Sequence, residues 1–546
     1  MDRRFPCALA PILLLSAVAA APAGAGTGEP GICRPDRPIR RIVIERVPVF
    51  DLEDDGGHLR GLYRAANLLH RPMQTRAATI RSLLTIREGE PCSREALEEA
   101  ERVLRSYIFV QDAWVTPAGI EDGGVVVRVR VQDAWSTRVR LSARRQGGAS
   151  KTAFGLREVN LFGTGSQLQW TSSRDQDRSE TVFTFLDPAL GPTKWRLLAR
   201  YGDNSDGLTR ELSVGRPFYE LDGRWEFLID ADSAAREEKV YVGGEIADRW
   251  RVRRNRARVS FGWSPRGLEG SRLRRWYLRA GVREESWTPA AGAAPARPDL
   301  APLDRDQLWL GAGREWFDID FRRVSLIDTG RRVEDLDLSR RVAIGIEFGA
   351  GRGEAAGGGT LILEARDGFQ TGRDAYLLLG ARHRVERLGS RFVDAETELR
   401  ARYVQKPSPL TALNLDLQAF RGSALEGPRR RLMGGDTGLR GYPSRAFSGD
   451  RALLLRAEFR YFAPWSVGKL FRLGAVAFAE LGGAWDRGHR LGAEVLHPDV
   501  GIGLRAYVKP SSGGTTLHLN AAYPLHREVA GRHFGLQVSF LAARSF

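Results

Sequence analysis

The stretch Leu453–Tyr461 reads LLLRAEFRY, and from Leu455 onward its chemistry alternates from one residue to the next. Successive side chains of a β-strand point to opposite faces, so one face of this segment carries large apolar groups and the other carries charge. The apolar set is Leu453, Leu455, Ala457, Phe459 and Tyr461, and the charged set is Arg456, Glu458 and Arg460. The pattern predicts a strand between an apolar medium and a polar interior.

The same alternation continues through residues 136–546, in segments of about 10 residues separated by turns rich in Gly, Asp, Pro or Arg. No convincing helix appears in this region. A soluble β-sandwich would also alternate, but the length, the aromatic residues near strand ends and the terminal Phe546 favour a transmembrane antiparallel β-barrel. Allowing roughly 26 residues for each strand and its connection predicts about sixteen strands, an even number that closes antiparallel.

The N-terminus has the features of a secretory signal peptide. Arg3 and Arg4 precede the apolar run Phe5–Ala20, and small residues follow to Ala25. We therefore expect residues 1–25 to be removed. Beyond them no stretch approaches the roughly 18 apolar residues that a membrane helix needs. A secreted chain makes nucleic acid a poor explanation of the net charge of +16, which fits a basic lumen or contact with anionic lipid better.

Residues 39–134 are predicted to form a compact α/β domain after a linker at 26–38. The expected order is strand, helix, helix, strand, strand, which packs as a three-stranded sheet with helices on one face. In an oxidising compartment Cys33 and Cys92 either pair or stay free, and the sequence leaves both alternatives open. The expected elements are Arg40–Phe50, Thr75–Thr85, a helix from Ser93, Ile108–Val115 and Val125–Val131.

The segment Gly434–Pro443 (GGDTGLRGYP) resembles the inward-folded loop motif of the BamA/TamA-like superfamily of outer-membrane assembly and secretion barrels, also known as the bacterial surface antigen family. The 39–134 domain, including Tyr107–Trp114, resembles a single polypeptide-transport-associated (POTRA) domain. Three further segments resemble the family's first barrel hairpin, a late strand and the penultimate strand: EVNLFGTG at 158–165, FAELG at 478–482 and AAYP at 521–524.

The resemblance implies that the loop folds back into the barrel and that its arginine pairs with an acid on the inner wall. Here the loop motif is Leu439, Arg440, Gly441 and Tyr442. The matching acid is Glu480, where the family often has aspartate, and Glu458 and Asp499 compete for this role. A buried arginine–carboxylate contact would hold the loop by charge-assisted hydrogen bonds.

The C-terminal segment is similar to the β-signal by which assembly machinery recognises the last strand of a barrel. The pattern is His533-x-Gly535-x-x-Val538-x-Phe540, with Phe534, Leu536, Val538 and Phe540 expected on one strand face. Phe546 lies six residues beyond Phe540 on that face. Recognition of such a strand is expected to work by edge pairing, in which the backbone supplies affinity and alternate side chains supply register.

We therefore expect a barrel in the cell outer membrane, with its POTRA domain in the periplasm, that acts in assembly, insertion or translocation of proteins. The expected partners are outer-membrane lipids or lipopolysaccharide and unfolded protein clients, with periplasmic chaperones or assembly lipoproteins as further candidates. We expect no enzyme activity, because no Ser/His or paired-carboxylate site can be assembled, and no cofactor or metal. One alternative is a two-partner secretion exporter. Family members of that type usually have an N-terminal plug helix, and residues 26–38 are too short to hold one. The other alternative is a passive pore or divergent surface antigen.

Overall fold

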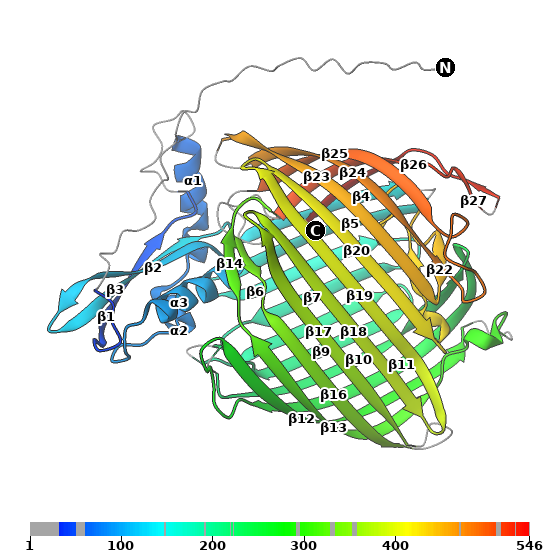
Figure 1. Cartoon of the computed structure of the whole chain (residues 1–546), viewed down its shortest axis with the longest axis horizontal. Coiled ribbons are helices and arrows are strands. Elements are labelled where there is room, and N and C mark those ends of the chain that lie inside the picture. Colours follow the sequence, from blue (N-terminus) through cyan, green and yellow to red (C-terminus); the bar gives the residue numbers. More distant parts are fainter. Residues whose placement is uncertain are drawn as a thin grey trace, which may run out of the picture.

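The computed structural model describes residues 32–546 except 51–59, 147–148, 191–192, 219, 222, 291–294, 328–333, 352–356, 469–470, 509–514, 530 and 545–546. The expected signal peptide, residues 26–31 of the linker and Phe546 therefore lie outside the described residues. The chain forms a small α/β domain followed by a large β-barrel (Figure 1). No helix in the described part is long and apolar enough to cross a membrane.

The N-terminal domain contains a three-stranded sheet in the order β1-β3-β2, with β1 parallel and β2 antiparallel to β3. This confirms the expected strands and two of the helices. An additional helix, α1, was not predicted, because it buries only Tyr63 and His70 and leaves its leucines exposed. The elements are β1 Ile39–Val47, α1 Arg60–His70, the 3-10 turn η1 Arg71–Met73, α2 Ala77–Leu83, α3 Arg94–Ser106, β2 Val110–Glu121 and β3 Gly124–Asp133.

Helix α3 covers the sheet of this domain. It begins after Ser93, where the sequence predicts its start, and the Ser93 hydroxyl caps it by accepting a hydrogen bond of 3.1 Å from the Ala96 amide. Leu97, Ala100 and Leu104 of α3 are buried in the core. They share that core with the alternate valines of β3, which are Val125, Val127, Val129 and Val131.

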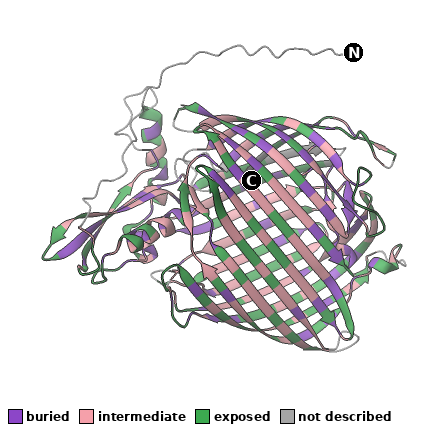
Figure 2. Ribbon diagram, in the orientation of Figure 1, coloured by how far each residue is buried: buried purple, intermediate pink, exposed green. Residues whose placement is uncertain are grey.

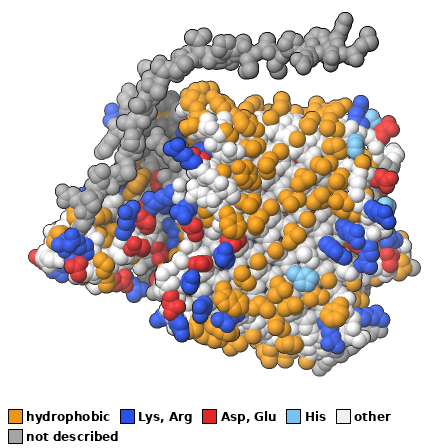
Figure 3. Space-filling model, in the orientation of Figure 1, with side chains coloured by type: hydrophobic (Ala, Val, Ile, Leu, Met, Phe, Trp, Pro, Cys, Tyr) orange, Lys and Arg blue, Asp and Glu red, His pale blue; other side chains and the backbone are white. Residues whose placement is uncertain are grey.

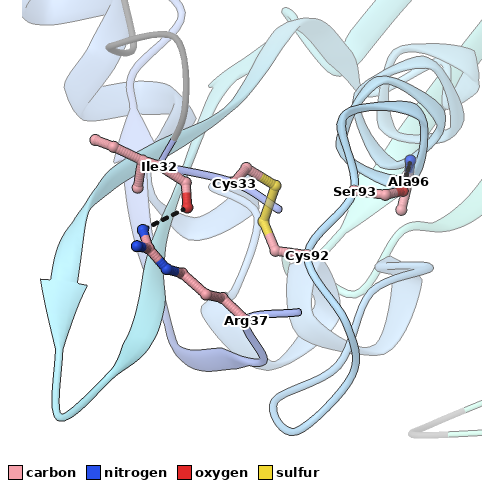
Figure 4. The surroundings of a disulfide bond; sticks show 6 residues. All are labelled: Ile32, Cys33, Arg37, Cys92, Ser93 and Ala96. Carbon is pink, nitrogen blue, oxygen red and sulfur yellow. Dashed lines mark hydrogen bonds between the residues drawn. A yellow bond between two sulfur atoms is a disulfide. The ribbon is translucent and has the colours of Figure 1, made fainter. Parts of the chain in front are cut away.

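A disulfide bond joins Cys33 to Cys92, with their Cα atoms 5.2 Å apart (Figure 4). It ties the segment before β1 to the loop that leads into α3, and Figure 4 shows Ser93 and Ala96 beside it. The two cysteines are 59 residues apart. In the loop-entropy model, a cross-link over that length raises the free energy of the unfolded state by about 4 kcal/mol and so stabilises the fold. The structure thus decides between the two alternatives that the sequence left open.

The barrel is closed and antiparallel, and it contains twenty described strands: β4–β13, β16–β20, β23–β26 and β29. The expected sixteen strands are wrong, because many connections are shorter than the estimate assumed. Only Ser205 and Asp206 separate β8 from β9, and only Gly243 and Gly244 separate β10 from β11. The barrel strands are β4 Thr137–Gln146, β5 Ala149–Leu161, β6 Ser166–Arg174, β7 Ser179–Asp187, β8 Arg196–Asn204, β9 Gly207–Arg216, β10 Trp225–Val242, β11 Glu245–Trp263, β12 Arg272–Pro289, β13 Arg305–Asp318, β16 Arg340–Gly351, β17 Gly358–Gly372, β18 Ala375–Leu388, β19 Arg391–Ser408, β20 Thr411–Ser423, β23 Arg451–Val467, β24 Phe471–Trp485, β25 His497–Val508, β26 Thr515–Pro524 and β29 Gln537–Arg544.

Small elements in the connections decorate the two ends of the barrel. The hairpin β14–β15 lies at the end that faces the N-terminal domain, whereas β22 lies at the opposite end (Figure 1). These elements are the 3-10 turns η2 Pro298–Leu300 and η4 Gly427–Arg429, and the two-stranded pairs β14 Phe321–Val324 with β15 Glu334–Asp337, β21 Arg431–Met433 with β22 Phe447–Gly449, and β27 Glu528–Val529 with β28 Arg532–His533.

The two faces of the barrel wall differ as predicted. On β23, Leu455, Phe459 and Tyr461 are exposed on the outside, whereas Glu458 and Arg460 are buried on the inside. Exposed and less exposed residues alternate along the strands in Figure 2. Figure 3 shows apolar side chains across the visible flank of the barrel and charged side chains mostly near its two ends. Such a surface is suited to a lipid environment.

The barrel closes between its first and last strands through a short ladder. Among the described residues, three pairs join β29 to β4, namely Val538–Arg145, Ser539–Arg144 and Phe540–Ala143. The pairing of β26 with β29 is much longer, from Thr515–Arg544 to Ala522–Gln537. The junction of β29 with β4, here called the seam, therefore has few backbone hydrogen bonds to break.

The last strand differs from the prediction at its start. Val538 and Phe540 do lie in β29 with exposed side chains, but the strand begins only at Gln537. The prediction that Phe534 shares a strand face with Val538 and Phe540 is wrong. Phe534 is buried against Tyr442, with ring centroids 5.6 Å apart, because the loop inside the barrel offers it an apolar surface.

Candidate functional site

The connection between β20 and β23, residues 424–450, folds back into the barrel and is here called the lumen loop. Its two arms pair as β21 and β22. A tight turn between them places the Leu439 amide 3.0 Å from the Gly434 carbonyl oxygen, and Gly438 has a φ of 126°, which favours glycine. Leu439 and Tyr442 are completely buried.

Arg440 makes the contact that the resemblance implies. Its Nε donates to Glu480 Oε1 at 2.8 Å and its Nη1 donates to Glu458 Oε2 at 3.0 Å. Its backbone amide donates to the other oxygen of Glu480 at 2.7 Å, and its guanidinium lies 3.4 Å from the centroid of the Phe478 ring. Glu480 therefore binds both the side chain and the backbone of the motif arginine.

Two further arginines of the barrel wall share these carboxylates. Arg456 Nε lies 3.2 Å from Glu480 Oε1, and Arg460 Nε donates to Glu458 Oε1 at 2.6 Å. Strands β23 and β24 bring the groups together because Arg456 and Glu480 are direct cross-strand partners. The cluster is nearly shielded from solvent, so the loss of one partner leaves a buried charge and costs about 3–5 kcal/mol.

The third acidic candidate, Asp499, holds the next residue of the motif. Its Oδ2 accepts a hydrogen bond of 3.0 Å from the Gly441 amide. A Cβ on residue 441 would lie only 2.6 Å from the Asp499 Cβ, so only glycine fits this approach. Tyr442 then donates its hydroxyl to the Pro498 carbonyl oxygen at 2.9 Å. Leu439 and Tyr442 pack in an apolar cluster with Phe420, Leu425, Met433, Ala446, Phe447, Ala452, Leu454, Ala484 and Phe534.

The structure thus brings together all four motif residues and all three acidic candidates. It does not bring the C-terminal β-signal residues Gly535, Val538 and Phe540 to this cluster, because Val538 and Phe540 face outward. Two anchors of the lumen loop escaped the sequence analysis. Arg445 forms an ion pair with Asp177 and donates to the Tyr241 hydroxyl at 2.8 Å.

The second missed anchor surrounds Arg305 at the start of β13. Its guanidinium is fully buried and lies 2.8 Å from Glu426 of the lumen loop and 3.0 Å from Asp394 of β19. Glu386 of β18 completes the ring of acids at 3.3 Å. No local motif marks these residues. The only sequence signal was an excess of arginine and acid on one strand face, which does not identify pairs.

The N-terminal domain is joined to the barrel by a buried polar cluster at the first barrel hairpin. Asn160, in the EVNLFGTG motif, donates to Thr75 Oγ1 and to the Met73 carbonyl oxygen, each at 2.8 Å. Thr75 in turn donates from its amide and hydroxyl to Asp133 at 3.0 and 2.6 Å. Burial raises the pKa of Asp133 to about 6, although the hydrogen bonds from Thr75 act in the opposite direction.

A second junction is made by the connection between β13 and β16. Arg105 of α3 lies 3.2 Å from Asp335 of β15, and Arg102 of α3 lies 4.3 Å from the Phe321 ring centroid of β14. The same connection enters the barrel, where the Ile327 carbonyl oxygen accepts a hydrogen bond of 2.9 Å from Arg460. Arg460 also binds Glu458, so this connection links α3 to the Arg440 cluster.

The arrangement holds protein segments in place. In the Arg440 cluster, both oxygens of Glu480 and both oxygens of Glu458 accept from arginines or a backbone amide, and Asp499 accepts from the Gly441 amide. Among the residues that the structure describes, no group of three or more His, Cys, Asp or Glu side chains is placed to hold a metal ion.

The fold and site define a class of protein, a closed antiparallel barrel with an apolar outer face, a loop clamped in its lumen and a small α/β domain at one end. Similar solved structures are CdiB from Acinetobacter baumannii (13% identity, 93% of this chain and 74% of that chain, TM-score 0.46) and CdiB from Escherichia coli (11%, 93% and 77%, 0.47). Another is BamA from Haemophilus ducreyi lacking POTRA domains 1–3 (12%, 92% and 84%, 0.39).

These values do not assign the chain to a family, because every identity is below 25% and every TM-score is below 0.5. No protein-family model matches the sequence, and no curated protein matches it.

Proposed function

We propose that this protein is an outer-membrane barrel of the BamA/TamA-like kind that inserts or translocates other proteins, with its N-terminal domain in the periplasm as a single POTRA-like domain. The observation that carries the proposal is the clamp of Arg440 by Glu480 and Glu458, reinforced by Asp499 at Gly441. A passive pore has no need of a loop held in its lumen by buried charges.

Two strand edges supply the mechanism under this proposal. In the N-terminal domain β2 is an edge strand, so its free backbone groups can pair with an extended client. In the barrel, opening the three-pair seam breaks the fewest backbone hydrogen bonds. An opened seam exposes the edges of β4 and β29, with which a new strand can pair. The lumen loop, through Arg440, keeps strands β23 and β24 in one conformation while the seam opens.

The first experiment measures planar-bilayer conductance of the refolded full chain. Arg440→Ala leaves Glu480 and Glu458 without their loop partner, so the loop detaches and openings become at least several-fold more frequent or larger than in the wild type. The matched control is Arg400→Ala, which removes a lumen-facing arginine that is 63% exposed and is paired with Glu398.

Conductance that is steady and identical in all three proteins contradicts the clamp and favours a passive pore. A second readout tests the activity itself. Liposomes that contain the wild-type protein are expected to accelerate the folding of an urea-unfolded outer-membrane barrel client, and Arg440→Ala is expected to reduce that rate about tenfold. No acceleration by the wild type contradicts the insertion activity, and it leaves an exporter of a dedicated client as the remaining candidate.

A further inference from the structure

Two arginines stand opposite each other on the outer face of the barrel. Arg421 lies near the end of β20, Arg451 is the first residue of β23, and the two are direct cross-strand partners. They belong to the same face as Leu417 and Leu455, which are also cross-strand partners, and Leu455 is 41% exposed on the outside. Both side chains therefore point outward from the barrel wall. They lie at the strand ends from which the lumen loop starts and to which it returns.

Neither arginine of this pair forms a salt bridge within the described part of the protein. Like charges directly opposite on adjacent strands are destabilising. Among the described residues, no acid lies within salt-bridge distance of Arg421 or Arg451. Asp450, the neighbour of Arg451 in sequence, lies 3.9 Å from Arg487 and attracts Arg451 only at longer range. By contrast, Arg251, which faces outward on β11, lies 3.8 Å from Glu237. An external anion would remove the repulsion between Arg421 and Arg451.

The surroundings of the pair define the kind of anion. Directly below the two arginines, the outer face continues with the pairs Ala419–Leu453 and Leu417–Leu455, so apolar chains can lie along the wall. On the other side, Thr397 of β19 is the cross-strand partner of Arg421, and its hydroxyl lies 3.0 Å from His383 Nδ1. Figure 3 shows lysine and arginine side chains gathered toward the barrel end away from the N-terminal domain.

We infer that Arg421 and Arg451 bind a phosphate group of a phosphorylated glycolipid of the outer leaflet, a lipid of the lipid A class. The inference rests on the proposed outer-membrane location, since the barrel end away from the N-terminal domain then faces the outer leaflet. Two guanidinium groups on neighbouring strands can each offer paired N–H donors to one phosphate. The acyl chains of the same lipid lie against the leucines of β20 and β23.

The test uses the full chain in phosphatidylcholine nanodiscs and titrates three probes: bis-phosphorylated lipid A, the same lipid A without phosphates, and phosphatidylglycerol. Bound lipid is counted by native mass spectrometry. We expect the double substitution Arg421→Gln/Arg451→Gln to weaken binding of bis-phosphorylated lipid A at least tenfold, and Arg421→Lys/Arg451→Lys to weaken it two- to fivefold. The matched control, Arg382→Gln/Arg400→Gln, removes the same charge from the lumen face of β18 and β19 and leaves binding unchanged.

Equal binding by the wild type and the Gln pair overturns the inference, as does an equal loss in the lumen control. Phosphatidylglycerol bound as tightly as lipid A also overturns it, because the surface would then select any phosphate headgroup. Resistance of the folded barrel to unfolding in cold detergent verifies that each variant is folded. A failure here is distinguishable from failure of the proposed function, because client folding and Arg440 conductance are measured without lipid A.

Discussion

At the scale of single residues, the lumen loop depends on a few side chains whose roles are not interchangeable. Glu480 accepts hydrogen bonds from both the side chain and the backbone amide of Arg440. The shorter side chain of an aspartate would reach both donors less easily. Gly441 is required because Asp499 approaches its backbone. Asn160 links the two domains in a similar way, because its side-chain amide donates to the Thr75 hydroxyl and to the Met73 carbonyl oxygen.

Gly441→Ala is predicted to detach the lumen loop without removing a charge. The new Cβ would lie 2.6 Å from the Asp499 Cβ and 3.1 Å from the Pro524 nitrogen, so the loop must move away. We expect openings in planar bilayers that resemble those of Arg440→Ala. The control is Gly488→Ala, since a Cβ at that position meets nothing within 4 Å. Wild-type conductance in Gly441→Ala would show that the loop tolerates the shift and would contradict the role of this contact.

Asp133 is predicted to make the stability of the N-terminal domain depend on pH. Its pKa of about 6 in the folded state exceeds the unfolded value of about 3.9, so the folded state binds the extra proton between pH 4 and 6. The contribution of Asp133 therefore falls as pH rises through that window, by up to about 3 kcal/mol. His70, 3.9 Å away, has a pKa lowered by burial and contributes with the opposite sign.

The test compares Asp133→Asn with the wild type, so that the contribution of His70 largely cancels. Pulse proteolysis of residues 39–134 in the refolded full chain, across a urea series, gives the free energy of unfolding at pH 4, 5, 6 and 7. Relative to the wild type, the variant is expected to gain stability as pH rises. A difference between the two proteins that is constant with pH would refute the elevated pKa.

At the scale of elements, the β14–β15 hairpin connects the two parts of the molecule. Its outer arm meets α3 through Asp335, and residue Ile327 reaches Arg460 inside the barrel. Lys406 of β19 donates to the Ser325 carbonyl oxygen at 2.6 Å, which fixes the same connection to the wall. Because this connection is bound to both α3 and the barrel wall, it holds the N-terminal domain against one end of the barrel.

Arg105→Ala is predicted to release this hairpin from α3. Arg105 is 9% exposed and pairs with both Asp335 and Glu101, so its loss costs about 1–3 kcal/mol locally. Hydrogen exchange of residues 334–337 in the full chain is expected to quicken about tenfold. The control Arg94→Ala removes an exposed helical pair with Glu98 and leaves that exchange unchanged. Unchanged exchange in Arg105→Ala would mean that barrel contacts alone hold the hairpin.

At the scale of the whole molecule, the barrel has one short seam and a lumen loop held by three anchors, at Arg440, Arg305 and Arg445. The anchors of Arg440 and Arg305 bind strands β13, β18, β19, β23 and β24 to the lumen loop. Opening at any ladder other than the seam would break a longer set of backbone pairs. The architecture therefore concentrates any lateral opening between β29 and β4.

A disulfide across the seam is predicted to block client insertion. Positions 539 and 144 are direct cross-strand partners, so the substitutions Ser539→Cys/Arg144→Cys lock β29 to β4 under oxidising conditions. We expect client folding into liposomes to fall at least tenfold and to recover after reduction. The control Asn520→Cys/Ser539→Cys locks β26 to β29, which already share a long ladder, and leaves the rate unchanged. Full activity with a locked seam would exclude lateral opening.

Sequence reasoning reached the local features and some distant ones. The alternation at Leu453–Tyr461 predicted both faces of β23, and Ser93 predicted the start of α3. The contact of Arg440 with Glu480 was reached through the resemblance and is present in the structure. The strand count and the placement of Phe534 were wrong, and helix α1 was missed, because connection lengths and the burial of isolated residues depend on neighbours far away in sequence.

The sequence by itself determined the strand texture and the polarity of each wall face, because a side-chain period of two is a local property of the chain. Only the tertiary structure decided how many strands close the barrel, which acids receive Arg440 and Arg305, and that Cys33 pairs with Cys92. These outcomes depend on register and on loops that return across the lumen. Each contact joins residues that are far apart in the sequence, and a local periodicity cannot predict such a contact.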